Sequence, residues 1–290
     1  MTSPRKTLGW VVAAVGAAMV VTAIYCAFHP GLTSTELGQI SGAEVVLMAV
    51  TVLPWLTVFA HKAARRFAPG ETGSGTWTML AWTSHLLGAG QIIGYLPSVL
   101  ELGPIEAIMV IAGQLMPATF RVFLCIALYR MCRAYRETGL DFRMRGLDYV
   151  LSVAVGVVAI VLIVFRDTLF LYWSVNADFG TTAHSAMLGA QTFNFLLYPA
   201  VFFLSLTMFR YSVQMGGGLV ARAWGGVALY GLLQPLHAFF IALGYDTLGP
   251  NLSIYFDNFI VLCAFSALAF GPVFQVEASR LKHDRHGNVG

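Results

Sequence analysis

The 290-residue chain is 58% hydrophobic and only 11% charged, and its formal net charge is +3. Soluble domains usually carry about 25% charged residues, so this composition excludes a soluble fold and makes a lipid bilayer the expected solvent. No polar stretch is long enough for a separate domain, and we expect one integral membrane domain over residues 1–290 with no nucleic acid partner.

Eight apolar runs follow one another along the chain. Each is about long enough to cross the ~30 Å hydrocarbon core as a helix, and none alternates like a barrel strand. The first run is 21 residues long, which exceeds a signal-peptide core, so we expect it to be retained. The predicted fold is an all-α bundle of about eight transmembrane helices, over Leu8–Phe28, Ala43–His61, Trp77–Leu100, Ile105–Tyr129, Leu147–Phe165, Ser185–Phe209, Ala221–Leu243 and Leu252–Val276.

The basic residues predict the orientation of this bundle. Of the 17 Lys and Arg residues, all but Arg121 and Arg166 fall at the two termini or in alternate loops, which places them on one side. An excess of Lys and Arg marks the cytoplasmic side of a membrane. We therefore expect a multi-pass protein of the plasma membrane with both termini in the cytoplasm.

Two related strings suggest an internal repeat. Gly94-Tyr95 precedes Leu102-Gly103-Pro104, and Gly244-Tyr245 precedes Leu248-Gly249-Pro250. Residues 1–146 and 147–290 would then be two four-helix halves related by an axis along the membrane normal. Gly and Pro are also common at helix ends, so the strings can arise without a repeat.

Arg121 is the most distinctive polar residue within the apolar runs. Ionisable groups in a membrane are costly unless they are paired or hydrated, which makes them the expected functional positions. Arg121 lies nine residues before Arg130, or roughly 13 Å from the inner interface. No acidic residue has a comparable estimated depth. Arg121 therefore either faces protein or water and binds an anionic headgroup or carboxylate, or it snorkels towards the inner face.

Polar side chains also follow one face of four predicted helices. Their spacings of three, four and seven residues place them on one side of each helix. Four such stripes are expected to face one another across a polar interior that binds a ligand. The alternative is that they form interhelical hydrogen bonds, each worth only about 0.6–2 kcal/mol. The predicted ligand-binding residues are Gln91, Gln114, Arg121, Gln191, Asn194, Tyr198, Tyr230 and Gln234, and Ser84 and Tyr95 share the stripe of Gln91.

A third group of polar residues lies in the outer half of the bundle. Asp257 and His237 have similar estimated depths on helices joined by a short connection, which makes the helices neighbours. The pair could share a proton, bind a cation or simply tie the helices together, and a shallow Asp257 could also be hydrated. Glu44, near the outer end of its helix, is a second candidate acid. His85 and His237 differ in estimated depth, which argues against a haem between them.

The sequence is compatible with three functions. The polar interior and the lack of a catalytic motif favour a transporter or sensor that handles a small molecule or lipid. An intramembrane enzyme acting on a lipophilic substrate such as an isoprenoid would use Asp257, His237 or Glu44 as catalytic groups, with aromatic side chains stabilising cations. The third possibility is a non-catalytic subunit of a membrane complex. We expect no cofactor, because the chain has no H-E-x-x-H, D-D-x-x-D or phosphate-loop motif.

Overall fold

The computed structural model describes residues 3–29, 31–68, 70–100, 102, 105–140, 144–165, 181–248 and 250–287, with the side chains of 34–35, 98, 181–183, 238–254 and 282–287 left out. This part of the chain is helical and contains no strand, which confirms the predicted all-α fold. Its helices are α1 (Pro4–Phe28), α2 (Ser34–Thr51), α3 (Leu53–Ala64), α4 (Thr72–Val99), α5 (Glu106–Glu137), α6 (Gly146–Val164), α8 (Thr181–Gln214), α9 (Leu219–Leu248) and α10 (Pro250–Gly287).

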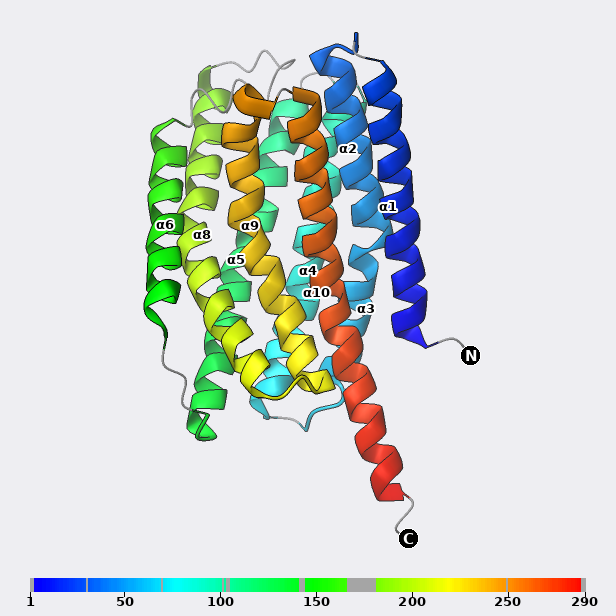
Figure 1. The fold of residues 1–290 in the computed structure, drawn as a ribbon, viewed down its shortest axis with the longest axis vertical. Helices are drawn as coiled ribbons and strands as arrows, with labels where there is room; N and C mark the ends of the chain where they lie inside the picture. The colour runs from blue at the N-terminus through cyan, green and yellow to red at the C-terminus, as the bar shows by residue number, and fades with distance from the viewer. Residues whose placement is uncertain are drawn as a thin grey trace.

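The helices form one bundle in which successive helices run in alternating directions, except that α3 continues in the direction of α2 (Figure 1). Only Val52 separates α2 from α3, so the two follow each other as one bent rod. In the interior, α4 packs on α5 and α9 packs on α10, while α5 contacts α8 and α10 contacts α2 and α3. α1 and α6 lie at the periphery, against α10 and α8 respectively. The start of α1 and the end of α10 lie at the same end of the bundle (Figure 1).

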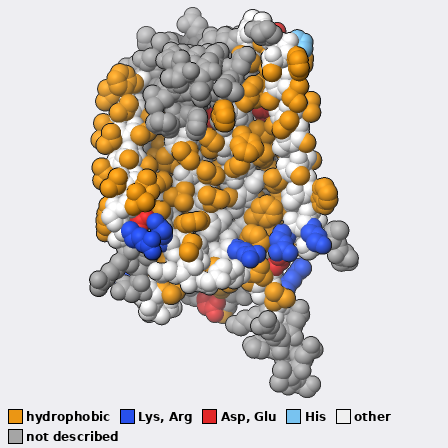
Figure 2. Space-filling model, viewed as in Figure 1, with side chains coloured by type: hydrophobic (Ala, Val, Ile, Leu, Met, Phe, Trp, Pro, Cys, Tyr) orange, Lys and Arg blue, Asp and Glu red, His pale blue; other side chains and the backbone are white. Residues whose placement is uncertain are grey.

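The surface is that of a membrane protein. Large apolar side chains are exposed on the peripheral helices, among them Trp10 and Phe28 on α1 and Val153 and Ile160 on α6. Figure 2 shows hydrophobic side chains covering this face, with Lys and Arg gathered towards the end where the termini lie. An apolar surface of this extent requires lipid.

Six stretches of the described residues are long and apolar enough to cross a membrane. The helices α4 and α9 have 28 and 30 residues and also belong to the bundle, but they are not among these six. The count of eight crossings therefore stays a prediction. The six stretches are Pro4–Phe28, Glu36–Ala64, Glu106–Glu137, Gly146–Val164, His184–Gln214 and Tyr255–Leu281.

The start and the bend of the α2–α3 rod follow from the local sequence. At the start, Thr33 and Glu36 form a capping box, in which each side chain accepts a hydrogen bond from the backbone of the other residue. At the bend, Pro54 stands near the first turn of α3. Proline has no N–H to donate to the preceding turn, so the helix is interrupted at Val52.

Glycine brings α4 and α5 unusually close together. A Cβ atom on Gly113 would lie 2.2 Å from Cα of Gly94, and one on Gly90 would lie 2.5 Å from Cδ of Pro117. Small residues at a membrane helix interface allow this backbone contact. Tyr95 directly follows Gly94, and Gln114 directly follows Gly113. The close approach of the two helices therefore brings these polar residues near one another.

The repeat and the division into two halves stay predictions. Gly103, Pro104 and Gly249 of the two strings lie outside the described residues, as does Arg166 of the predicted outer loop.

Candidate functional site

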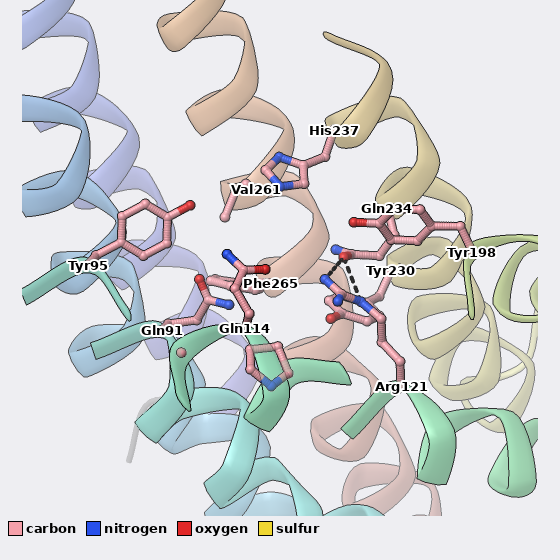
Figure 3. Close-up of a pocket in the computed structure, with 12 residues that line it drawn as sticks. Gln91, Tyr95, Gln114, Arg121, Tyr198, Tyr230, Gln234, His237, Val261 and Phe265 are labelled. Atoms are coloured by element: carbon pink, nitrogen blue, oxygen red, sulfur yellow. Dashed lines mark hydrogen bonds between the residues drawn. The ribbon is translucent and has the colours of Figure 1, made fainter. Parts of the chain in front are cut away.

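A polar chamber lies inside the bundle, between α4, α5, α8, α9 and α10 (Figure 3). About 50 Å³ of it is open to water-sized molecules, which is room for a few waters at roughly 10–15 Å³ each. Its wall combines amide, phenol, guanidinium and imidazole groups with a smaller apolar part. The lining residues are Gln91, Tyr95, Gly113, Gln114, Pro117, Arg121, Tyr198, Tyr230, Gln234, His237, Val261 and Phe265.

The structure thus brings together most of the predicted ligand-binding residues. Gln91, Gln114, Arg121, Tyr198, Tyr230 and Gln234 all line this one chamber, although they come from four different helices. Tyr95 and His237 join them. At least one residue of each of the four stripes lines this chamber, but Ser84, Gln191 and Asn194 are not among its lining residues.

Arg121 is held in the middle of the bundle, with 7% of the residue exposed. Its Nε and Nη2 groups donate to Oε1 of Gln234 on α9, at 3.2 and 2.7 Å, and its Nη1 donates to Oδ1 of Asn194 on α8. The guanidinium carbon lies 5.2 Å from the ring centre of Tyr198. These contacts tie α5 to α8 and α9, and the side chain does not snorkel to the inner face.

The hydrogen-bond partners of Arg121 are neutral amides. The ion pairs within the described residues are Arg5–Glu277, Arg133–Glu137, Arg210–Asp148 and His237–Asp257, and none of them includes Arg121. A guanidinium presents five N–H groups in a planar fork that matches a carboxylate or phosphate. Three of these groups of Arg121 donate to amide oxygens.

Asn194 is oriented by a second contact. Its Nδ2 donates to the backbone oxygen of Gln114 at 3.0 Å and to Oε1 of the same residue at 3.1 Å. This fixes which side of the amide faces Arg121, because the nitrogen is already engaged with α5.

Gln191, one turn before Asn194, is buried, but its Oε1 has no partner among the described residues and it is not part of the chamber wall.

His237 and Asp257 are in contact, as their estimated depths predicted. Nδ1 of His237 is hydrogen-bonded to Oδ1 of Asp257, and both residues are buried. Of the two, His237 is a lining residue of the chamber, and Asp257 on α10 interacts electrostatically with the lining residues Tyr95 and Tyr198. Asp257 therefore orients the imidazole ring and leaves Nε2 for other partners.

Two predicted positions belong to other parts of the bundle. Glu44 accepts hydrogen bonds from Oγ1 of Thr22 on α1 and from Nδ2 of Asn258 on α10. Ser84 pairs with Oγ1 of Thr57 on α3 at 2.7 Å, so the stripe on α4 reaches the chamber only through Gln91 and Tyr95.

Sequence reasoning missed several buried polar residues. Asp148 at the start of α6 is fully buried, and its Oδ1 accepts from Nη2 of Arg210 at 2.6 Å, which attaches α6 to α8. Asn258 could have been noted because it follows Asp257 within an apolar run. Nothing in the sequence marks Val261 and Phe265 as chamber residues.

The chamber offers little to a metal ion. Among the described residues, no group of three or more His, Cys, Asp or Glu side chains could hold one. Guanidinium and amide N–H groups are instead the donors that anions and water require.

No known protein family, curated protein or solved structure matches this chain.

Proposed function

We propose that this membrane protein binds a small molecule or lipid with an anionic group in the chamber, and that it acts as a transporter or sensor. The observation that carries the proposal is Arg121, a buried cation that donates to the neutral amide oxygens of Gln234 and Asn194 and takes part in no ion pair of the described residues. An ionised group buried without a counter-charge costs several kcal/mol. A carboxylate or phosphate that enters the chamber would remove this cost.

The amides around Arg121 support an exchangeable site. Gln234 and Asn194 hold the guanidinium through side-chain oxygens that carry no charge, whereas a carboxylate or phosphate would add charge attraction and could accept two parallel hydrogen bonds from the guanidinium fork. The ring of Tyr198 beside the guanidinium keeps its plane in place. An anion would therefore displace Gln234 and Asn194 from a preorganised arginine.

We place the chamber in an eight-crossing bundle in the plasma membrane, with both termini in the cytoplasm. The helices α4 and α9 are about 42 and 45 Å long at about 1.5 Å per residue, which exceeds the hydrocarbon thickness. Counting the α2–α3 rod as one crossing then gives eight. The start of α1 and the end of α10 lie at the same end of the bundle, and Lys and Arg gather there (Figures 1 and 2). Both observations support this orientation.

Two sets of positions support the repeat. Pro54 and Arg65 on the α2–α3 rod are eleven residues apart, as are Pro199 and Arg210 on α8. On the following helices, Trp77 of α4 and Trp224 of α9 pack ring against ring, with centroids 4.8 Å apart. Equivalent residues that meet are expected at an axis between two halves.

A second candidate function is an intramembrane enzyme, which the His237–Asp257 pair favours. A carboxylate that orients an imidazole at a cavity wall is the arrangement needed for proton transfer. The substrate would place its reacting group near Nε2 of His237. Glu44 is not part of this arrangement, because its hydrogen-bond partners are Thr22 and Asn258.

The binding proposal is tested by removing the charge of Arg121. Purified protein in lipid nanodiscs is unfolded thermally in the presence of single carboxylates, phosphate and sulfate. At least one anion should raise the unfolding temperature of the native protein and leave Arg121→Gln unchanged. Arg133→Gln is the matched control, because Arg133 lies on the same helix but pairs with Glu137 at the surface. An Arg121→Gln variant that keeps the full anion response would refute the proposal.

The orientation is tested by cysteine labelling in a variant without the four native cysteines. Cysteines at Glu71 and Thr138 should react only from the cytoplasm, and one at Asn176, which lies outside the described residues, only from the exterior. Gly70 and Gly139 in the same loops are unsuitable, since their φ angles of +91° and +82° disfavour a side chain. Labelling of Asn176 from the cytoplasm would contradict eight crossings.

A further inference from the structure

A second polar cluster lies between α1, α2 and α10, apart from the chamber; two of its residues are buried and two are half-buried. We call Thr22, Ser41, Glu44 and Asn258 the Glu44 cluster. Oγ1 of Thr22 donates to Oε1 of Glu44, and Nδ2 of Asn258 donates to Oε2 at 2.6 Å. Ser41 completes the group, with its Oγ 3.3 Å from Oδ1 and 3.2 Å from Nδ2 of Asn258.

Glu44 in this cluster has no positive partner. The residue is 5% exposed, and none of the ion pairs in the described part of the chain includes it. Neutral donors alone do not compensate a buried carboxylate charge. A proton, or a cation that binds beside the carboxylate, would remove the remaining cost of burying this charge.

The cluster also has the ligands that a small cation needs. It gathers five side-chain oxygen atoms: two from Glu44 and one each from Thr22, Ser41 and Asn258. Hydroxyl oxygens have lone pairs left when they donate, and an amide can turn its oxygen in place of its nitrogen. A single carboxylate matches a single positive charge, whereas divalent cations are usually held by more than one carboxylate.

We infer that the Glu44 cluster is a binding site for a small monovalent cation, a sodium ion or a proton. Intramembrane carboxylates surrounded by neutral oxygen ligands suit such ions, because binding leaves the site without net charge. The inference does not depend on anion binding in the chamber.

The cluster is joined to the chamber through α10. Asn258 of the cluster directly follows Asp257, which holds His237. Consecutive residues of a helix point about 100° apart, so one turn of α10 faces both groups. A cation at Glu44 therefore binds to the same turn that orients a residue of the chamber wall.

Other titratable groups near the cluster must be controlled for. Cys26 on α1 and Tyr255 on α10 lie next to it, and Tyr255 interacts electrostatically with Glu44. On α4, which also packs against α2, Tyr95 lines the chamber and His85 faces His61. Tyr255→Phe and Cys26→Ser should leave any response of Glu44 intact.

The test measures the unfolding temperature of the full-length protein in nanodiscs, with sodium chloride against choline chloride at mildly alkaline pH, and then in choline at decreasing pH. The native protein should be stabilised by sodium or by acidification, and Glu44→Gln, which mimics the neutral state, should respond to neither. Glu36→Gln is the matched control on the same helix, because glutamine keeps the capping box.

The outcomes separate the two ions. A sodium effect that Glu44→Gln abolishes identifies a sodium site, and a pure pH effect that it abolishes identifies a proton site. Should Glu44→Gln not fold, Thr22→Val removes one oxygen and should weaken the apparent ion affinity about tenfold. A native protein indifferent to both ions, or an unchanged response in Glu44→Gln, would overturn the inference.

Discussion

Gln234→Glu tests whether the charge of Arg121 is truly uncompensated. Two N–H groups of Arg121 meet the same atom, Oε1 of Gln234, at 3.2 and 2.7 Å. The substitution keeps the size of the side chain and supplies a carboxylate at the same position. At 2.7 Å and an effective dielectric constant of about 20, the added attraction is about 6 kcal/mol. Burial of a carboxylate offsets several kcal/mol of this, which leaves a net stabilisation of about 2 kcal/mol.

A gain of about 2 kcal/mol changes the ratio of folded to unfolded protein by a factor of about 30. It is measured by denaturant unfolding in nanodiscs, followed by the fluorescence of the buried Trp77 and Trp224. The same variant should no longer respond to anions, because its own carboxylate occupies the guanidinium. Gln275→Glu is the control: Gln275 is buried with its Oε1 unpartnered among the described residues, and a carboxylate there should destabilise. A Gln234→Glu protein as unstable as this control would show that Arg121 is already neutralised, and the reasoning would fail.

Two further substitutions examine the chamber wall and its support. Asp257→Asn should keep the fold, because asparagine has nearly the same size, but it removes the carboxylate that holds His237 and should change the anion affinity of the chamber; equal anion affinities in both proteins would reduce the His237 contact to a tie between helices. Gly113→Ala should destabilise by about 1–3 kcal/mol, because its Cβ would lie 2.2 Å from Cα of Gly94, a backbone atom that cannot turn aside. Gly156→Ala on α6 has no atom within 4 Å and should be neutral or slightly stabilising, so equal losses in a denaturation assay would contradict the proposed contact.

The helices could be predicted from the sequence, because a helix that crosses the hydrocarbon core must be apolar over about 20 residues. The predicted run Ile105–Tyr129 corresponds to α5, but the helix continues to Glu137. Arg130, Arg133 and Arg136 are good helix formers, so the helix extends into the aqueous side, where hydropathy carries no signal. The run Ala43–His61 likewise begins later than α2, because the capping box at Thr33 starts the helix before the apolar stretch does.

The chamber could be predicted in part, because polar spacing determines a shared face within one helix. It does not determine how that face is rotated towards other helices. Ser84 and Gln91 share a stripe, yet Ser84 turns to Thr57 while Gln91 lines the chamber. The contact between Glu44 and Asn258 joins residues 214 positions apart. Only the packing of the bundle reveals such a pair.

The glycine contacts of the bundle have a mechanical consequence. Gly94 and Gly113 lock α4 to α5, and a Cβ on Gly226 of α9 would lie 2.5 Å from the carbonyl oxygen of Ala267 on α10, so these two helices are locked in the same way. Packed interfaces of this kind move as rigid bodies. Widening the chamber therefore means shifting one helix pair against the other, and the Arg121–Gln234 hydrogen bonds cross that boundary. An anion that replaces Gln234 as the partner of Arg121 would therefore also break the hydrogen bonds between the α4–α5 pair and the α9–α10 pair.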